Sequence, residues 1–358
     1  MVYAEIILFL VGLVLLVLGA EYFIKSSASI AKKLGISEFI IGLTLVALGT
    51  SIPELASSIV AALANASGII IGNVVGSNIA NIGLIVGIAA TIALIKTKKE
   101  MIWRDGLIMI FASVLFYIFM LNGSISKIEA GILLLLYIAY MAFLIEEQPE
   151  FEEYHFGHFL RYFLEFRYLN TIKSKLFAPF IPKKNDHRKN KKYSPEMTKK
   201  EKELFRKGLI KDILITILSG AAVVFGAKYL VQEAIFFANL FNVPDTLIGL
   251  SLIAVGTSLP ELFVSVSAAF KGYGNIAVGN IIGSNIANIF LIIGVSGLIR
   301  SIEIIKGTLY YTAPFMIFMS ILLLVFIRSQ WKIRRIEGTI FLVLYAVFMT
   351  LMFVNGLA

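Results

Sequence analysis

A 46-residue stretch occurs twice in this chain, and this duplication constrains the fold more than any other feature. Residues 42–87 read GLTLVALGTSIPELASSIVAALANASGIIIGNVVGSNIANIGLIVG, and residues 249–294 repeat them at a constant offset of 207 residues without a gap. In this alignment 26 of the 46 positions are identical, and the informative identities are Gly, Thr, Ser, Pro, Glu and Asn rather than interchangeable aliphatic residues. The chain therefore contains two copies of one structural unit.

Both copies are hydrophobic enough to lie in a bilayer, and the rest of the chain has the same character. Of its 358 residues, 58% are hydrophobic and only 15% are charged, which is outside the usage of soluble proteins. Apolar runs of about 20 residues, the length that crosses the hydrocarbon core, are found at ten places. They are 5–24, 38–63, 69–95, 105–121, 125–145, 210–231, 245–270, 275–299, 308–327 and 337–355. We expect an all-α polytopic membrane protein with ten transmembrane helices.

The distribution of basic residues predicts how these helices are oriented. The polar stretch 146–209 holds 15 of the 32 Lys and Arg residues, so the positive-inside rule predicts that it is cytoplasmic. The shorter loops agree with this assignment, and both termini are then extracellular. We expect a multi-pass protein of the cell membrane, with one membrane half at 1–145, a basic cytoplasmic loop at 146–209 and a second half at 210–358.

The two copies enter the membrane in opposite orientations, because five predicted helices, an odd number, separate their starts. This predicts two inverted five-helix repeats, an architecture of many secondary transporters, with the binding site where the repeats meet. The same offset pairs Glu21 in GAEY with Lys228 in GAKY. These charges are interpreted as ends of helices that reach the membrane interface, with a gating salt bridge as the alternative.

Each copy carries one carboxylate within an apolar run, and an ionisable group at that depth indicates a functional site. In the first copy this residue is Glu54. Pro53 removes the hydrogen bond that would engage the carbonyl of Gly49, so the helix should kink and free backbone oxygens there. Thr50 lies four residues before Glu54 and shares its face. The second copy repeats the arrangement with Thr257, Pro260 and Glu261.

The second part of each copy predicts a close helix contact and a polar stripe. Gly72 and Gly76 have the spacing that lets membrane helices approach closely. Asn73, Ser77 and Asn81 follow one another at intervals of four and should face the other half of the bundle. Their counterparts are Asn280, Ser284 and Asn288.

The donor atoms of the two copies are all oxygens, and such a set suits a hard cation. Calcium takes six to eight oxygens in flexible geometry, whereas magnesium dehydrates reluctantly. Two carboxylates neutralise one divalent ion or leave room for a few sodium ions at the same oxygens. Mutually exclusive occupancy by two cations is the physical basis of exchange.

Other readings of these motifs remain. A proline can produce only a kink, and GxxxG can serve only packing, but no Lys or Arg lies in the core spans that contain the motifs and every feature occurs twice. The chain has no Cys, and its three His residues lie between 155 and 187, outside the predicted spans. An intramembrane hydrolase would need a catalytic dyad that the spans lack, and no nucleotide-binding motif is present. The chain is therefore not expected to be an enzyme, and a channel would gain nothing from inverted repeats.

GTSIPEL with GNVVGSNIANIG, and GTSLPEL with GNIIGSNIANIF, resemble the two alpha-repeats of the sodium/calcium exchanger family, in its compact prokaryotic form. The resemblance implies a sodium/calcium antiporter that works by alternating access, in which the first and sixth helices slide across a fixed core. It needs no cofactor, and its substrates are Ca²⁺ and Na⁺. The alternative on the same fold is a proton/calcium antiporter, or one for another divalent cation.

The resemblance also implies which residues bind the ions. Glu54 and Glu261 would be the central calcium ligands, shared by sodium. The remaining ligands it implies are the Thr50 and Thr257 oxygens for both ions, the Ala47 and Ala254 carbonyls and the Ser77 and Ser284 hydroxyls for sodium, and Asn81 and Asn288 at the middle of the site. Potassium-dependent relatives carry Asp in place of Asn288, so transport here should be potassium-independent.

The central loop is less informative. Residues 155–177 mix aromatic and basic side chains and are compatible with an interfacial helix on anionic lipid. The run KKNDHRKNKK at 183–192 predicts a disordered segment attracted to the membrane, so contact with anionic lipids is expected over 155–192. Nucleic-acid binding is not expected of a membrane loop.

Overall fold

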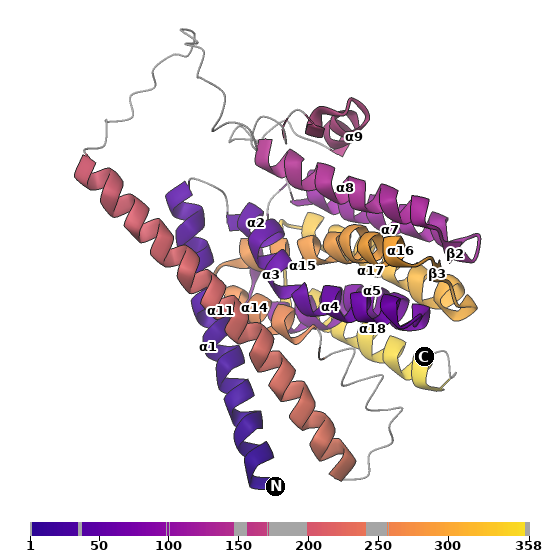
Figure 1. Cartoon of the computed structure of the whole chain (residues 1–358), viewed down its shortest axis with the longest axis horizontal. Helices are drawn as coiled ribbons and strands as arrows, with labels where there is room; N and C mark the ends of the chain where they lie inside the picture. Colours follow the sequence, from indigo (N-terminus) through magenta and orange to yellow (C-terminus); the bar gives the residue numbers. More distant parts are fainter. Residues whose placement is uncertain are drawn as a thin grey trace.

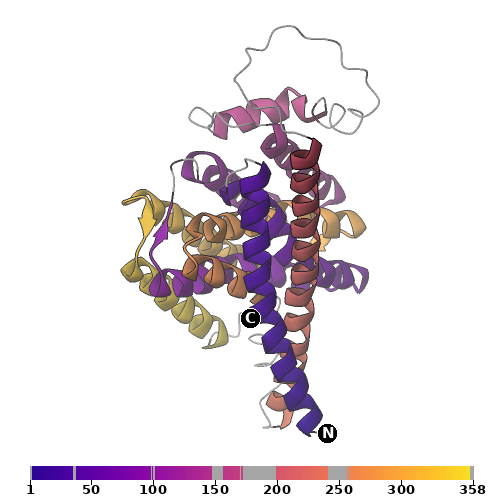
Figure 2. The ribbon, with the colours of Figure 1, turned by 90° about the vertical axis from the view of Figure 1, so that its left-hand side faces the viewer.

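The computed structural model describes residues 2–34, 38–97, 99, 101–146, 156–169, 171, 199–240, 256 and 258–354. Almost all of these residues are helical, as the sequence predicts. Two long helices, α1 (Val2–Leu34) and α11 (Lys199–Leu240), lie side by side along one flank of a bundle that the other helices form (Figures 1 and 2).

The first half of the bundle consists of short helical segments that continue one another. In chain order they are α2 (Glu38–Ile41), η1 (Gly42–Val46), α3 (Ala47–Thr50), α4 (Ile52–Leu63), α5 (Ser67–Ala80), η2 (Asn81–Val86), α6 (Gly87–Ile92), η3 (Met101–Gly106), α7 (Leu107–Met120) and α8 (Lys127–Glu146). The η segments have the wider π-helical hydrogen bonding, which is frequent at functional sites.

The second half, where it is described, repeats the elements from α4 onward. They are α14 (Leu259–Phe270), α15 (Gly274–Ala287), η6 (Asn288–Ile293), α16 (Gly294–Ile299), η7 (Thr308–Thr312), α17 (Ala313–Arg328) and α18 (Arg335–Val354). From α14 to α16 both ends of each element lie 207 residues after those of α4 to α6. The sequence duplication is therefore a duplication of structure.

Two small antiparallel sheets join the halves. Strand β1 (Ile95–Lys96) pairs with β4 (Lys332–Ile333), and β2 (Ser124–Ile125) pairs with β3 (Ile302–Glu303). Each sheet thus takes one strand from each half, with Ile95 opposite Ile333 and Ile125 opposite Ile302. All four isoleucines are buried, so both sheets hold the two halves together through packed side chains as well as backbone hydrogen bonds.

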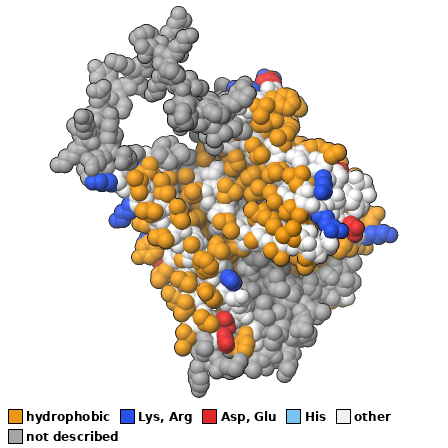
Figure 3. Space-filling view, viewed as in Figure 1, with side chains coloured by type: hydrophobic (Ala, Val, Ile, Leu, Met, Phe, Trp, Pro, Cys, Tyr) orange, Lys and Arg blue, Asp and Glu red, His pale blue; other side chains and the backbone are white. Residues whose placement is uncertain are grey.

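Within the described residues, eight helices are long and apolar enough to cross a membrane, or nine if α3 and α4 with their preceding segments count as one bent span. The ten predicted spans are thus matched in part. The predicted span 245–270 is described only from residue 256 onward, and there α14 is a short apolar helix. Hydrophobic side chains cover much of the described surface, while Lys and Arg gather mostly near its margins (Figure 3).

Helices α1 and α11 are tied to each other by polar contacts that cross their interface. Lys33 Nζ lies 2.7 Å from Asp212 Oδ2, and Ser29 Oγ donates to the same oxygen at 2.5 Å. Further along the pair, Thr216 Oγ1 donates to Ser26 Oγ at 2.8 Å. These contacts make α1 and α11 one structural unit.

Glu21 does not pair with Lys228, so neither sequence-based reading of these two charges describes Glu21 fully. Its carboxylate lies 2.7 Å from Lys25 Nζ and 3.0 Å from Lys271 Nζ, at the end of α14. Lys228 is exposed. Glu21 therefore connects the α1–α11 pair to the core bundle.

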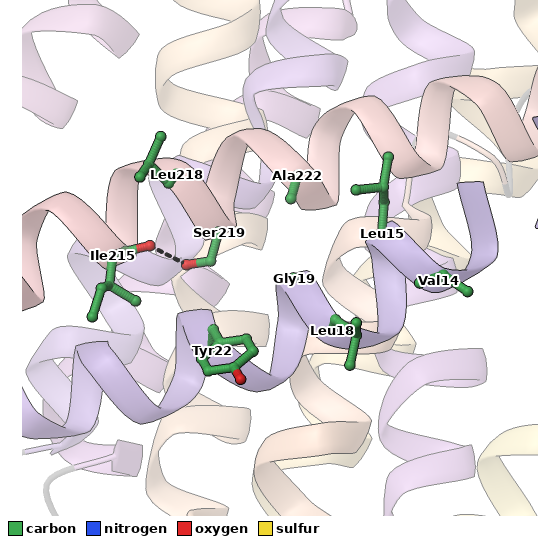
Figure 4. Close-up of a pocket in the computed structure, with 9 residues that line it drawn as sticks. All are labelled: Val14, Leu15, Leu18, Gly19, Tyr22, Ile215, Leu218, Ser219 and Ala222. Atoms are coloured by element: carbon green, nitrogen blue, oxygen red, sulfur yellow. Dashed lines mark hydrogen bonds between the residues drawn. The ribbon is translucent and has the colours of Figure 1, made fainter. Parts of the chain in front are cut away.

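An apolar groove of about 310 Å³ lies between α1 and α11 (Figure 4). Val14, Leu18 and Tyr22 line one wall, and Ile215, Leu218 and Ala222 line the other. The groove contains no carboxylate, so it is not the site that the sequence predicts.

The central loop contains a helix within the predicted 155–177 segment and ends in an extension of α11. Helix α9 (Phe156–Leu164) packs Phe159 against Tyr140 and Phe143 of α8, with ring centroids 6.1 and 5.7 Å apart. The α9 segment therefore covers the bundle with its aromatic face. Helix α11 begins at Lys199, ten residues before the predicted end of the loop, and residues 172–198 lie outside the described part of the chain.

Candidate cation-binding site

In both copies of the repeated motif, a serine with non-helical backbone angles precedes the helix that carries the glutamate. In the first, α3 ends at Thr50 and α4 begins at Ile52, with a bend of 46°. Ser51, the residue between them, has φ −83° and ψ 8°, and Pro53 lies at the start of α4. The predicted kink is confirmed, and it takes the form of a break two residues before the proline. The equivalent Ser258 has nearly the same backbone angles, φ −89° and ψ 6°.

The two motif glutamates lie in the first turns of the helices that follow these serines. Glu54 and Glu261 are each only 1% exposed, and the positive end of a helix favours a carboxylate in its first turn. Neither glutamate is paired with a basic side chain among the described residues. Two buried carboxylates without a basic partner form a site whose negative charge a bound cation can neutralise.

Serine hydroxyls join the two halves around these carboxylates in a crossed pattern. Ser51 Oγ donates to Glu261 Oε1 at 3.0 Å and lies 3.1 Å from Ser284 Oγ. In the mirrored arrangement, Ser258 Oγ donates to Glu54 Oε1 at 3.4 Å and lies 3.2 Å from Ser77 Oγ. Each carboxylate is thus held by the serine of the opposite copy, and the two motifs form one shared site.

The asparagines at the start of each polar stripe have a different role. Asn73 Nδ2 donates to Ser58 Oγ at 2.9 Å and to the Glu54 carbonyl at 3.0 Å. Through these two bonds Asn73 contacts α4 of its own half. Its counterpart Asn280 bonds Ser265 in the same way and also lies 3.2 Å from Thr50 Oγ1 of the other half.

The asparagines at the end of each stripe cross the interface, as predicted. Asn81 Nδ2 donates to Asn285 Oδ1 at 2.9 Å, and Asn288 Nδ2 donates to Asn78 Oδ1 at 2.9 Å. Both Asn81 and Asn288 are 1% exposed and begin the π-helical segments η2 and η6.

Four buried oxygens of this site accept no hydrogen bond from any described residue. They are Oε2 of both glutamates and Oδ1 of Asn81 and Asn288. A buried acceptor without a donor is uncommon, and each one calls for an explanation such as a bound ion. These four atoms form two pairs related by the 207-residue offset, so chance is a poor explanation.

The remaining predicted ligands are located as follows. Thr50 and Ala47 are both 1% exposed, and the Ala47 carbonyl accepts the Ser51 N–H at 3.0 Å. Ser77 and Ser284 are buried and contact the serines of the opposite copy. Ala254 and Thr257 lie outside the described residues.

The site also includes residues that the sequence reasoning did not select. Ser51 and Ser258 hold the carboxylates, and Asn78 and Asn285 accept the asparagine amides. All four are identical between the two copies, and this is the signal that could have identified them.

The chemistry of the site is that of oxygen ligands with only two charges. Within the described residues no group of three or more His, Cys, Asp or Glu side chains is placed to hold a metal ion. Any bound cation must therefore be held by the two carboxylates together with neutral hydroxyl, amide and carbonyl oxygens. Such a set matches calcium or sodium rather than a transition metal.

Comparison with known proteins places this geometry in a family. The family model described as "Sodium/calcium exchanger protein" matches residues 4–146 and 211–354. The chain is 52% identical over 354 residues to sodium/calcium exchanger MaX1 of Methanosarcina acetivorans, covering 99% of both chains. It is 32% identical to the putative antiporter CaxA of Alkalimonas amylolytica, covering 96% of this chain and 97% of that one.

A solved structure supports the same family assignment. The sodium-calcium exchanger NCX_Mj has the same fold with a TM-score of 0.76 and 29% identity, and the match covers 98% of this chain and 99% of that one. The family match extends over both halves of the chain, including both copies of the motif that builds the shared site. This chain belongs to the sodium/calcium exchanger family.

Proposed function

We propose that this protein is a secondary antiporter that exchanges sodium for calcium across the membrane, and that both ions use the site shared by the two motifs. The observation that carries the proposal is a set of four buried oxygens around two carboxylates; among the described residues these oxygens have no hydrogen-bond donor and the carboxylates have no basic partner. A transporter needs such a place, because its cargo supplies the missing charge only when bound. The protein is then a carrier and not an enzyme.

Glu54 and Glu261 would bind calcium together with the Thr50 hydroxyl. Thr257 is added because it is equivalent to Thr50 at the 207-residue offset. The two carboxylates balance one divalent charge, and the neutral oxygens complete the coordination. Sodium ions would use the same carboxylates, so calcium and sodium compete.

The sodium ligands extend outward from the centre. Ser77 and Ser284 would contribute hydroxyls. Ser258 contacts Ser77 and Ser51 contacts Ser284, so the hydroxyls of Ser258 and Ser51 lie next to these sodium ligands. Asn81 and Asn288 line the middle of the site, where both have an unpaired Oδ1. The Ala47 carbonyl, and by equivalence that of Ala254, completes the set.

The halves 1–145 and 210–358 would form two inverted five-helix repeats with ten membrane spans. The common offset of their elements, and the pairing of one strand from each half in both sheets, support this arrangement. The basic residues of 146–209 support a cytoplasmic loop and extracellular termini.

The chain has no cysteine, so a single Ser194→Cys substitution reports the side of the loop. Labelling of this cysteine in intact cells by an impermeant maleimide would contradict the orientation.

Alternating access would move α1 and α11 together across the core. Their mutual ion pair and hydrogen bonds support motion as one unit. Glu21 and Lys271 form an ion pair between this unit and the core, and that contact must change when α1 and α11 slide.

Transport would be independent of potassium, since both central amide positions are Asn. Proton coupling is the second possibility on the same fold, and no described contact favours it.

Calcium-45 uptake into proteoliposomes tests the proposal. We expect uptake when the vesicles are loaded with sodium and diluted into sodium-free buffer, and no uptake from vesicles loaded with potassium or choline. Adding potassium to both sides should leave the rate unchanged. Uptake driven by a pH gradient without sodium would assign the chain to proton coupling, and gradient-independent flux would indicate a channel.

A further inference from the structure

The asparagine residues at the centre of the site form two crossed amide pairs, and each pair joins the two halves. Asn81 Nδ2 donates to Asn285 Oδ1, and Asn288 Nδ2 donates to Asn78 Oδ1, both at 2.9 Å. Asn78 and Asn285 are equivalent at the 207-residue offset, as are Asn81 and Asn288. The same contact is therefore built twice by different parts of the chain.

The accepting amides are themselves held in one orientation. Asn78 Nδ2 lies 3.4 Å from the Asn285 carbonyl and 3.5 Å from Met316 Sδ, and Asn285 Nδ2 lies 3.7 Å from Met109 Sδ. Met109 and Met316 are again related by 207 residues. With each Nδ2 directed toward these groups, the Oδ1 of Asn78 or Asn285 is presented to the partner amide. Both residues are 1% exposed, so water does not compete for these contacts.

The orientation of the accepting amide decides which atom Asn81 and Asn288 offer to a cation. A side-chain amide has an acceptor oxygen at one end and a donor NH₂ at the other. Because the NH₂ of Asn81 is bonded to Asn285, its Oδ1 points away from that contact, and it accepts no hydrogen bond from the described residues. The same holds for Asn288 with Asn78. A flipped amide would instead present N–H groups, which repel a cation.

We propose that Asn285 and Asn78 are positioning residues for cation binding, each fixing the amide of the opposite half so that its Oδ1 faces the ion. Neither touches the ion itself. This inference rests on the proposed function, because it assigns a ligand role to Asn81 and Asn288. It also explains why the site depends on both halves: each half supplies a ligand amide and the group that orients the other half's ligand.

A double-mutant cycle with Asn81→Ala and Asn285→Ala tests the proposal. The half-saturating sodium concentration is measured for calcium uptake into proteoliposomes, with the rate at saturating sodium recorded separately. Asn285→Ala alone should raise the half-saturating concentration on the order of tenfold, the size typical of groups that orient a metal ligand. In the Asn81→Ala background the same substitution should have no further effect, because it acts only through Asn81.

Controls separate positioning from general packing. Ser296 is fully buried, and its hydroxyl has no hydrogen-bond partner in the described part of the chain, so Ser296→Ala should leave half-saturation unchanged. If Asn285→Ala does not yield folded protein, the equivalent cycle with Asn78→Ala and Asn288→Ala is used.

Additive effects in the cycle, or a change no larger than that of Ser296→Ala, would overturn the inference while leaving sodium/calcium exchange intact. Loss of folding in both Asn78→Ala and Asn285→Ala would also overturn it, since the role would then be structural. Absence of sodium-dependent uptake by the unmodified protein would instead contradict the proposed function.

Discussion

Replacing Glu54 by glutamine is expected to lower sodium-driven calcium uptake by about 100-fold or more, and Glu261→Gln should do the same. Glutamine keeps the size of the side chain but removes one of the two charges that balance calcium. Removing one partner of a buried charge pair costs about 3–5 kcal/mol. A loss of about 3 kcal/mol in calcium affinity corresponds to about a 100-fold weaker site.

The matched control is Glu303→Gln, which neutralises an exposed glutamate of β3. This variant should transport at the rate of the unmodified protein. The crossed contacts further require that the two motif glutamates behave alike, because each is held by the serine of the other copy. Full activity in either motif variant, or a large difference between them, would contradict a site shared equally by both copies.

Gly283→Ala is expected to destabilise the folded protein by about 1–3 kcal/mol or more, the cost of forcing extra atoms into a packed core. A Cβ at this position would lie 2.5 Å from the Leu43 carbonyl oxygen and 2.8 Å from Ala47 Cβ. The first of these atoms is backbone and cannot rotate away. The substitution would also push α15 away from α3, where Ala47 and Thr50 belong to the site, so transport should fall as well.

Gly131→Ala is the control for this substitution. Gly131 lies in α8, and an added Cβ there would meet only Leu298 Cδ2 at an ordinary 3.7 Å. Thermal unfolding in detergent, followed by size-exclusion chromatography, should show a lower Tm for Gly283→Ala and an unchanged or slightly higher Tm for Gly131→Ala, because alanine favours the helix more than glycine does. Equal Tm values for Gly283→Ala and the unmodified protein would show that the α15 contact is not tight.

The central chemistry of the site could be predicted from the sequence because the duplication isolates it. Glu54 and Glu261 are recognisable as two carboxylates in apolar runs, and both are buried, each bonded to a serine of the opposite copy. The stripe periodicity correctly predicted that Ser77 and Asn81 face the other half. For Ser77 and Asn81 the four-residue spacing was sufficient because α5 is a regular helix up to Ala80.

Other residues could not be predicted because their roles depend on contacts between the copies. Asn78 lies one position after Ser77 and therefore off the four-residue stripe, yet it accepts the Asn288 amide across the interface. Ser51 was passed over in favour of Thr50 because the helix break that aims its hydroxyl at Glu261 is a feature of the folded chain. The bonds of Asn73 to Ser58 and to the Glu54 carbonyl are likewise contacts between neighbouring helices that a periodicity rule does not reveal.

The helical boundaries of the loop were missed for a related reason. Charged residues from Lys199 to Lys207 suggested that this segment belongs to the basic loop, but α11 continues through them. The pairing of Asp212 with Lys33 and Ser29 of α1 provides partners that local composition does not reveal.

The most direct test of the central claim is equilibrium calcium-45 binding to the purified protein while sodium is titrated. If both ions use one shared site, each molecule binds one calcium ion, and sodium displaces it completely with a dependence steeper than one sodium per calcium, whereas choline has no effect. Calcium binding that persists at saturating sodium would contradict the claim, because the two ions would then occupy separate sites.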